Sequence, residues 1–287
     1  MIRKAWRIGA AHGPVVLVRR GLARAKRWIA ERRHATRLRQ AAWHPRRLPS
    51  EPEFVAFAPA GPSPLLSIII PAFERWPLTN ACLTALREAW DDEIDAEVIV
   101  VDDGSRDETA ALLAGCPNVR AIALPENRGF VEAVNAGAEA ARGRLLFFLN
   151  NDAFVTPGCI RALIETLEPE YVGAAAAQLC YPGGTISEAG GIVWRDARGV
   201  NYGRGDDPRD WRYRYAREVD YGSAAALMVR ADAFRDTGGF SREFAPAYYE
   251  DTDLCFALRD AGLRVVYQPR ALVYHLGGAS YGSDADA

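Results

Sequence analysis

The sequence predicts an α/β fold in which a mostly parallel central sheet is flanked by helices on both faces. From Leu65 onward, short runs of β-branched and aromatic residues alternate with stretches whose apolar residues recur at helical spacing. Such alternation is typical of strand–helix–strand units, which build parallel sheets. Polar residues also follow three of the predicted strands directly, and sheets of this kind bind ligands outside the carboxyl ends of their strands.

The predicted elements follow one another in a regular order. Apolar runs predict strands at 66–70, 96–101, 118–124, 144–149 and 271–274. Helical spacing predicts a helix after the first strand and another over 130–141. Ser105 followed by Glu108 matches a capping box that opens a short helix. A last helix begins near Asp251 and ends at Gly262.

Composition excludes several classes of protein. The 287 residues are 49% hydrophobic and 25% charged, which is enough for one large core or two modest ones. No run of about 18 apolar residues occurs, so we expect no spanning helix and a cytoplasmic location, at most peripheral on the inner face of the plasma membrane. The five cysteines form no CxxC pair, which argues against a disulfide framework or a zinc ribbon.

The charge is divided unevenly between two parts of the chain. Residues 1–50 hold 14 Lys and Arg but one acid, for a net +13, and the remainder carries 21 basic and 36 acidic residues, for −15. Apolar residues at helical spacing over 15–29 predict an amphipathic basic helix, which either docks on an anionic membrane surface or packs on a neighbouring domain. We expect no nucleic acid, because no aromatic or glycine pattern of a nucleic-acid reader accompanies the arginines. Three segments are predicted: a basic helical extension (1–47), a proline-rich linker (48–64) and the α/β domain (65–287).

Acids and amides gather at the ends of three predicted strands. The first strand leads into Pro71, Phe73 and Glu74, the second into Asp102 and Asp103, and the fourth into Asn150, Asn151 and Asp152. Neighbouring carboxylates raise one another's pKa, so such a cluster needs a cation. Mg²⁺ and Mn²⁺, held by one or two carboxylates and a substrate diphosphate, would supply it. The alternative for residues 150–152 is an Asx turn that leads to Pro157.

A second acidic group lies far downstream. Glu250, Asp251 and Asp253 stand behind Tyr248 and Tyr249 at the start of the last predicted helix. Acids in a first helical turn are common because they favour the helix dipole, but a carboxylate here would also serve as a general base. No GxGxxG and no GxxxxGK[ST] occurs, which removes the main support for dinucleotide redox chemistry and P-loop phosphoryl transfer.

Taken together, five stretches resemble the family 2 glycosyltransferases of the GT-A fold. They are SIIIPAFER, VIVVDDGSRDET, NRGFVEAVNAG, LLFFLNND and YEDTDLCFALRDAGLRVVYQPRALVYH, and they cover residues 66 to 280 in that family's order and spacing. The resemblance is strongest to the rhamnosyltransferase-like modules of bacterial cell-surface polysaccharide glycosyltransferases. It implies inverting transfer of a sugar from a UDP- or dTDP-sugar to a saccharide or lipid-linked acceptor.

The resemblance also implies roles for individual residues. Asp251, with Glu250, would act as the catalytic base, and Asp152, Asn150 and His275 would hold Mg²⁺ or Mn²⁺. Tyr248 and Tyr249, with the stretch 183–221, would meet the acceptor. The nucleotide sugar would be bound by Pro71, Phe73, Glu74, Asp102, Asp103, Arg128, Gly129, Asn150 and Asn151.

One departure from the family pattern leaves other functions open. Asn150 stands where the family more often has Asp, so a catalytically silent nucleotide-sugar-binding module of a larger protein is an alternative. A sugar nucleotidyltransferase is a weaker one, since such an enzyme wants a Gly-rich, basic loop after the first strand and PAFERWPLT is not that.

Overall fold

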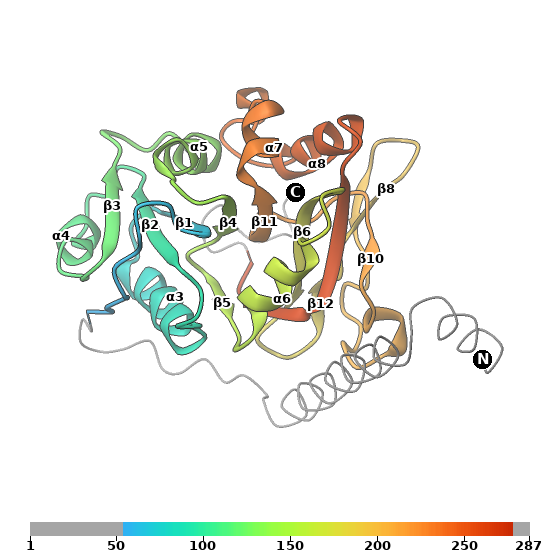
Figure 1. Cartoon of the computed structure of the whole chain (residues 1–287), viewed down its shortest axis with the longest axis horizontal. Helices are drawn as coiled ribbons and strands as arrows, with labels where there is room; N and C mark the ends of the chain where they lie inside the picture. The colour runs from blue at the N-terminus through green and yellow to red at the C-terminus, as the bar shows by residue number, and fades with distance from the viewer. Residues whose placement is uncertain (1–53, 278–287) are drawn as a thin grey trace, which may run out of the picture. The chain divides into compact units, whose positions relative to one another are not determined.

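The computed structural model describes residues 54–277 of the chain (Figure 1). The predicted basic extension and the first part of the predicted linker lie outside the described residues. Residues 54–65 contain neither helix nor strand. Within 54–277, no helix is long and apolar enough to cross a membrane.

A ten-stranded mixed sheet forms the centre of the described part, and the predicted α/β fold is confirmed. Its order is β10-β12-β6-β11-β4-β1-β2-β3, with β5 beside β12 and β7 beside β6, while β8 and β9 form a separate hairpin. The four strands from β1 to β4 run parallel, and β11 runs antiparallel between β4 and β6. The bounds are β1 (Leu66–Ala72), β2 (Ala96–Asp102), β3 (Val119–Ala123), β4 (Leu145–Leu149), β5 (Ala153–Val155), β6 (Val172–Cys180), β7 (Ile186–Glu188), β8 (Gly191–Val193), β9 (Gly199–Asn201), β10 (Arg217–Glu218), β11 (Ala226–Arg230) and β12 (Arg264–His275).

Helices cover both faces of this sheet (Figure 1). Side chains of β4 alternate between two cores: Phe147 packs on the face covered by α3 and α6, and Phe148 packs on the face covered by α5, α7 and α8. Because both faces are covered, β4 is buried along its whole length and reads as a continuous apolar run. The helices are α3 (Trp76–Glu88), α4 (Thr109–Leu113), α5 (Phe130–Ala140), α6 (Cys159–Thr166), α7 (Ala231–Asp236) and α8 (Glu250–Asp260), with 3₁₀ turns η1 (Trp211–Tyr213) and η2 (Arg242–Phe244).

The predicted capping box is wrong. Helix α4 begins at Thr109, whose N–H donates to the side chain of Asp107 at 3.0 Å, so Asp107 rather than Ser105 binds the first turn. The Ser105 hydroxyl instead accepts the backbone N–H of Glu74 at 2.7 Å. Because β1 and β2 end at the same edge of the sheet, the loop that follows β2 meets the loop that follows β1 before the helix begins. All five cysteines are buried and unbridged.

The site residues gather at the edge where β1, β2 and β4 end. Strand β11 runs in the opposite direction, so it begins at this edge, with Ala226 opposite Leu149. The peptide N–H of Asn150 donates to the carbonyl of Ala225 at 3.1 Å. The loop before β11 therefore lies against the residues that follow β4.

Candidate active site

Asp103 connects the end of β2 to the start of α5. One carboxylate oxygen accepts the N–H of Arg128 at 2.8 Å, and the other accepts the N–H of Gly129 at 2.8 Å. The side chain is 4% exposed, and burial raises the pKa of Asp103 above its usual range. Its neighbour Asp102 is also buried and accepts the N–H of Ser105 at 3.1 Å. Both acids thus order the loops at the carboxyl ends of the strands.

The start of α5 packs closely on the loop that carries the two tyrosines. Gly129 has φ +87°, and a Cβ there would lie 2.6 Å from the Cβ of Pro246. The N–H of Val131 donates to the carbonyl of Pro246 at 3.3 Å. The adjacent Arg128 side chain is exposed. The contact joins the β2–α5 part of the site to the segment before α8.

Asn150, Asp152 and His275 form one group. The His275 Nε2 atom lies 3.1 Å from Asp152 Oδ1 and 3.5 Å from Asn150 Nδ2. Asp152 is buried, and the Oδ1 atom of Asn150 is buried without a hydrogen-bond partner. His275 reaches this position because the end of β12 pairs with β5, where it stands opposite Ala153. The group therefore presents a carboxylate, a ring nitrogen and an unused amide oxygen together.

Asn151 does not join this group. Its side chain is buried and donates from Nδ2 to the hydroxyl of Thr79 on α3 at 3.1 Å. The middle residue of the NND stretch thus points to the helix that covers the sheet, while its two neighbours turn to His275.

Asp251 lies at the start of α8 and meets the loop before β11. Its Oδ2 accepts the N–H of Ala224 at 3.2 Å, and its Oδ1 accepts the N–H of Thr252 at 2.6 Å. Burial raises the pKa of Asp251. Since Ala225 binds the N–H of Asn150, two consecutive residues connect Asp251 to the group around Asp152.

Glu250 is buried beside Asp251. Its Oε2 atom has no hydrogen-bond partner. Burial raises the pKa of Glu250 to about 8, and the negative charge of Asp251 adds to the effect. Glu250 therefore holds its proton more readily than an exposed glutamate does.

Aromatic side chains stand exposed at the rim. Tyr248 and Tyr249 are 56% and 49% exposed, and Phe73 after β1 is 39% exposed. The hydroxyl of Tyr249 accepts the N–H of Gly199 on β9 at 3.5 Å. The β8–β9 hairpin is thereby tied to the start of α8.

Pro71 and Glu74 flank Phe73 at the end of β1. Both are partly buried, and Glu74 is held through its backbone by Ser105.

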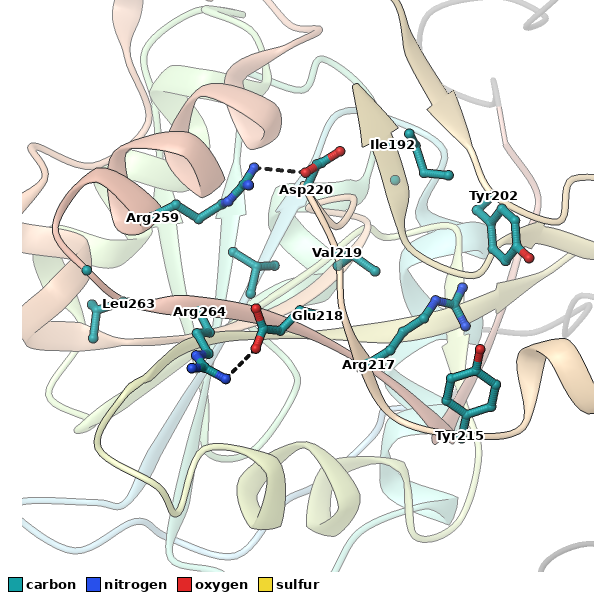
Figure 2. Close-up of a pocket in the computed structure, with 13 residues that line it drawn as sticks. Ile192, Tyr202, Tyr215, Arg217, Glu218, Val219, Asp220, Arg259, Leu263 and Arg264 are labelled. Carbon is teal, nitrogen blue, oxygen red and sulfur yellow. Dashed lines mark hydrogen bonds and ion pairs between the residues drawn. The ribbon is translucent and has the colours of Figure 1, made fainter. Parts of the chain in front are cut away.

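A cavity of about 580 Å³ is lined in part by Gly191 and Ile192 of the same hairpin (Figure 2). Tyr202 and Tyr215 line one side of it, and Ile192 extends from β8. Figure 2 also shows two ion pairs, Arg259 with Asp220 at 3.0 Å and Arg264 with Glu218. The cavity is lined partly by the stretch 183–221 expected to meet the acceptor and partly by residues between Arg259 and Val265, and its lining does not include the acids of the strand ends.

Sequence reasoning missed one buried acid near Asp251. Glu188 ends β7, is 1% exposed and accepts the N–H of Ser223 at 2.8 Å. In the sequence, Glu188 lies two residues after the apolar Ile186 and just before the small residues of AGG, inside the stretch 183–221 expected to meet the acceptor.

The sequence model of Glycosyl transferase family 2 matches residues 67–234. The chain belongs to this family. It is 29% identical to the O-antigen biosynthesis protein RfbC of Myxococcus xanthus over 79% of its own length. That alignment spans 18% of RfbC, so the chain corresponds to less than a fifth of this relative.

Solved structures of glycosyltransferases share the fold. The mannosyltransferase PcManGT from Pyrobaculum calidifontis, in complex with GDP-Man and Mn²⁺, has a TM-score of 0.56 and 18% identity, covering 90% of this chain and 69% of its own. GalNAc-T7 with UDP, GalNAc and Mn²⁺ has a TM-score of 0.61 and 15% identity, covering 75% and 44%. The predicted GT-A fold is confirmed.

Proposed function

We propose that this glycosyltransferase moves a sugar from a UDP- or dTDP-sugar to a saccharide or lipid-linked saccharide acceptor, with inversion, during cell-surface polysaccharide synthesis. The observation that carries the proposal is that two consecutive residues of one loop bind both parts of the site. The N–H of Ala224 donates to the carboxylate of Asp251, and the carbonyl of Ala225 accepts the N–H of Asn150. An acid suited to act as a base is thus fixed beside a group suited to hold a cation. The likeness to the O-antigen biosynthesis protein supports the polysaccharide context.

The nucleotide is assigned to the ends of β1 and β2. The exposed ring of Phe73 offers a face for the base, with Pro71 and Glu74 beside it. Asp103 has an acceptor lone pair left on each oxygen after its bonds to the backbone, which suits the imide N–H of uracil or thymine. The exposed Arg128 places positive charge at the start of α5, and Asp102 orders the loop that faces the ribose.

A divalent cation is assigned to Asp152, Asn150 and His275. Among residues 54–277, no group of three or more His, Cys, Asp or Glu side chains forms a metal site by itself. The unpartnered oxygen of Asn150 supplies the third donor, and oxygen ligands of this kind suit Mg²⁺ and Mn²⁺. When bound, the ion would neutralise the diphosphate. Structural relatives that hold Mn²⁺ with a nucleotide or nucleotide sugar support this assignment.

Asp251 is assigned the role of base. It takes the proton of an acceptor hydroxyl, whose oxygen attacks the anomeric carbon on the face opposite the diphosphate. The bond from that carbon to the diphosphate oxygen breaks with its electron pair, so the sugar is transferred with inversion. A pKa raised by burial suits this role, because a stronger base accepts the proton more readily.

The acceptor is assigned to Tyr248, Tyr249 and the cavity of Figure 2. Tyr249 binds the same β8–β9 hairpin whose Ile192 lines the cavity. Exposed tyrosine rings beside paired Arg and Asp or Glu side chains offer stacking faces and hydrogen-bonding groups that suit a saccharide.

Donor turnover tests the proposal. The protein is incubated with UDP-, dTDP- and GDP-sugars and Mn²⁺, and nucleotide diphosphate release is measured with water or added saccharides as acceptor. We expect release from a UDP- or dTDP-sugar, and Asp251→Asn should lower kcat at least about 100-fold. Asp260→Asn, at the exposed far end of α8, is the matched control.

Two results would contradict the proposal in different ways. Nucleotide binding without release from any donor would identify a silent binding module, consistent with Asn150 in place of Asp. Full activity of Asp251→Asn would show that another group is the base.

A further inference from the structure

The loop before β11 is held at three consecutive residues by three different partners. The N–H of Ser223 donates to Glu188 at 2.8 Å, the N–H of Ala224 donates to Asp251 at 3.2 Å, and the carbonyl of Ala225 accepts the N–H of Asn150 at 3.1 Å. Two of these partners belong to the proposed base and cation site. The third, Glu188, has no role in the reaction described above.

Packing leaves this segment little room to move. Ala224 and Ala225 are buried, and the Ser223 hydroxyl accepts the N–H of Ala225 at 3.2 Å. On the preceding residue, a Cβ at Gly222 would lie 2.2 Å from the Cβ of Ala176 in β6. The segment is therefore wedged between β6 and α8, and its orientation depends on what holds its first N–H group.

We propose that Glu188 is a positioning residue for sugar transfer: its carboxyl group fixes the Ser223–Ala225 segment, which in turn aligns Asp251 with the Asn150 side of the site. This inference rests on the proposed role of Asp251. Glu188 itself does not touch the substrates.

A carboxyl group is buried at this place, and it accepts the Ser223 N–H group. Burying a polar group costs free energy unless it is hydrogen-bonded, so this bond holds both the acid and the segment in place. The titratable groups that act on Glu188 or are acted on by it are Asp251 and Cys255 from α8 and Tyr221 from the preceding loop. Burial, followed by the charge of Asp251, raises the pKa of Glu188 to about 8. Glu188 thus holds its proton more readily than an exposed glutamate does.

Ionisation of Glu188 gives the proposal a kinetic signature. Above about pH 8, a second negative charge arises beside Asp251, and repulsion between the two should disturb the alignment. We expect turnover to fall in this range. Glu188→Gln keeps an acceptor for the Ser223 N–H group but cannot ionise, so its turnover should fall less steeply there, with Glu250 beside Asp251 left to ionise in the same range.

The experiment compares Glu188→Ala, Glu188→Gln, Ser187→Ala and Asp251→Asn with the unchanged protein, using the donor that gives nucleotide diphosphate release. Ser187 is the neighbouring buried residue of β7 and serves as the control for packing. We expect Glu188→Ala to lower kcat about 10- to 100-fold with a donor KM changed less than about threefold, because misplacement of a reacting group affects the chemical step. Glu188→Gln should restore kcat at pH 7 to within about threefold.

Hydrogen exchange at the amides of Ser223 and Ala224 supplies a readout that does not depend on activity. Exchange there should be faster in Glu188→Ala, and unchanged in Glu188→Gln and Ser187→Ala. Equal kcat in Glu188→Ala and the unchanged protein would overturn the proposal. If Glu188→Ala does not fold, the pH profile decides, and a Glu188→Gln profile that falls as steeply above about pH 8 as that of the unchanged protein would overturn it.

The Asp251→Asn variant separates the two ideas. If it loses activity while Glu188→Ala keeps it, the inference about Glu188 fails and the proposed function stands. If Asp251→Asn is fully active, the proposed base is wrong, whatever Glu188 does.

Discussion

His275 Nε2 lies 3.1 Å from Asp152 Oδ1, so the last strand of the described chain closes the group that follows β4. The ring also lies 3.5 Å from the amide nitrogen of Asn150. The contact exists because β12 extends past β6 and pairs its end with β5. The ring nitrogen of His275, near the end of the described residues, therefore lies beside the side chains of Asn150 and Asp152, which follow β4.

Asn150→Asp should increase the affinity for Mn²⁺. A carboxylate in place of the unpartnered amide oxygen adds a negative charge to the ligand set, and we expect a gain of about tenfold. Titration calorimetry with Mn²⁺ in the presence of UDP measures it. Asn151→Asp is the matched control, because the Asn151 side chain is bound to Thr79, and it should give no gain. A lower affinity in Asn150→Asp would argue against a cation at this group.

Asp103→Ala should destabilise the fold and weaken UDP binding together. The substitution removes an acceptor of two backbone N–H groups at the start of α5, and the Gly129 N–H keeps only its 3.1 Å bond to Asn127. An unsatisfied buried donor costs about 1–3 kcal/mol. Asp103→Asn keeps one acceptor oxygen and should lose about half as much. Urea unfolding gives the loss of stability, and calorimetry with UDP gives the loss of affinity. Unchanged stability of Asp103→Ala would contradict the role of these two bonds.

The sequence was sufficient for the part of the sheet that is most apolar. Strands β1, β2 and β4 are buried on both faces, so their β-branched and aromatic runs stand out, and the acids that follow them lie at one edge as predicted. Strand β6 was not predicted. Its residues VGAAAAQLC include four consecutive alanines, which have low β-propensity, and its conformation is set by pairing with β11 and β12.

Residues of the candidate site could be predicted where an acid stands just after a predicted strand or at the start of a predicted helix. Asp103, Asp152 and Asp251 each follow a strand or begin a helix, and the structure places them at connected loops. Glu188 was not predictable, because its partner is the backbone N–H group of Ser223, a contact 35 residues away that leaves no pattern in the sequence. The contact also depends on the antiparallel direction of β11, because this direction puts the loop before β11 at the site. That direction is set by pairing with β4 and β6 and cannot be read from the local sequence.

Stability should decrease as the pH rises from about 5 to 8. Burial raises the pKa of Glu188 and of Glu250 from 4.5 to about 8, so between these values the folded state holds protons that the unfolded chain has released. Each extra proton lowers the free energy of unfolding by about 1.4 kcal/mol per pH unit. Glu188→Gln should flatten this slope and make the protein more stable than the unchanged chain at pH 8. Urea unfolding at several pH values measures the slope, and an equally steep slope in Glu188→Gln would contradict it.

Gly129→Ala should be more damaging than Gly158→Ala, although both glycines precede helices with positive φ. Gly158 has φ 85° and ψ −4°, and a Cβ there would meet nothing within 4 Å, so alanine should cost only the left-handed strain of about 1–2 kcal/mol. Gly129 has φ 87° and ψ 173°, a region that essentially only glycine visits, and its Cβ would lie 2.9 Å from the backbone Cα of Pro246.

We therefore expect Gly129→Ala to cost at least about 3 kcal/mol and to separate α5 from the loop that leads to Tyr248. Urea unfolding of both variants measures the difference in stability, and UDP affinity should fall in Gly129→Ala alone. Equal losses in the two variants would show that the close contact between Gly129 and Pro246 does not hold the two halves of the site together.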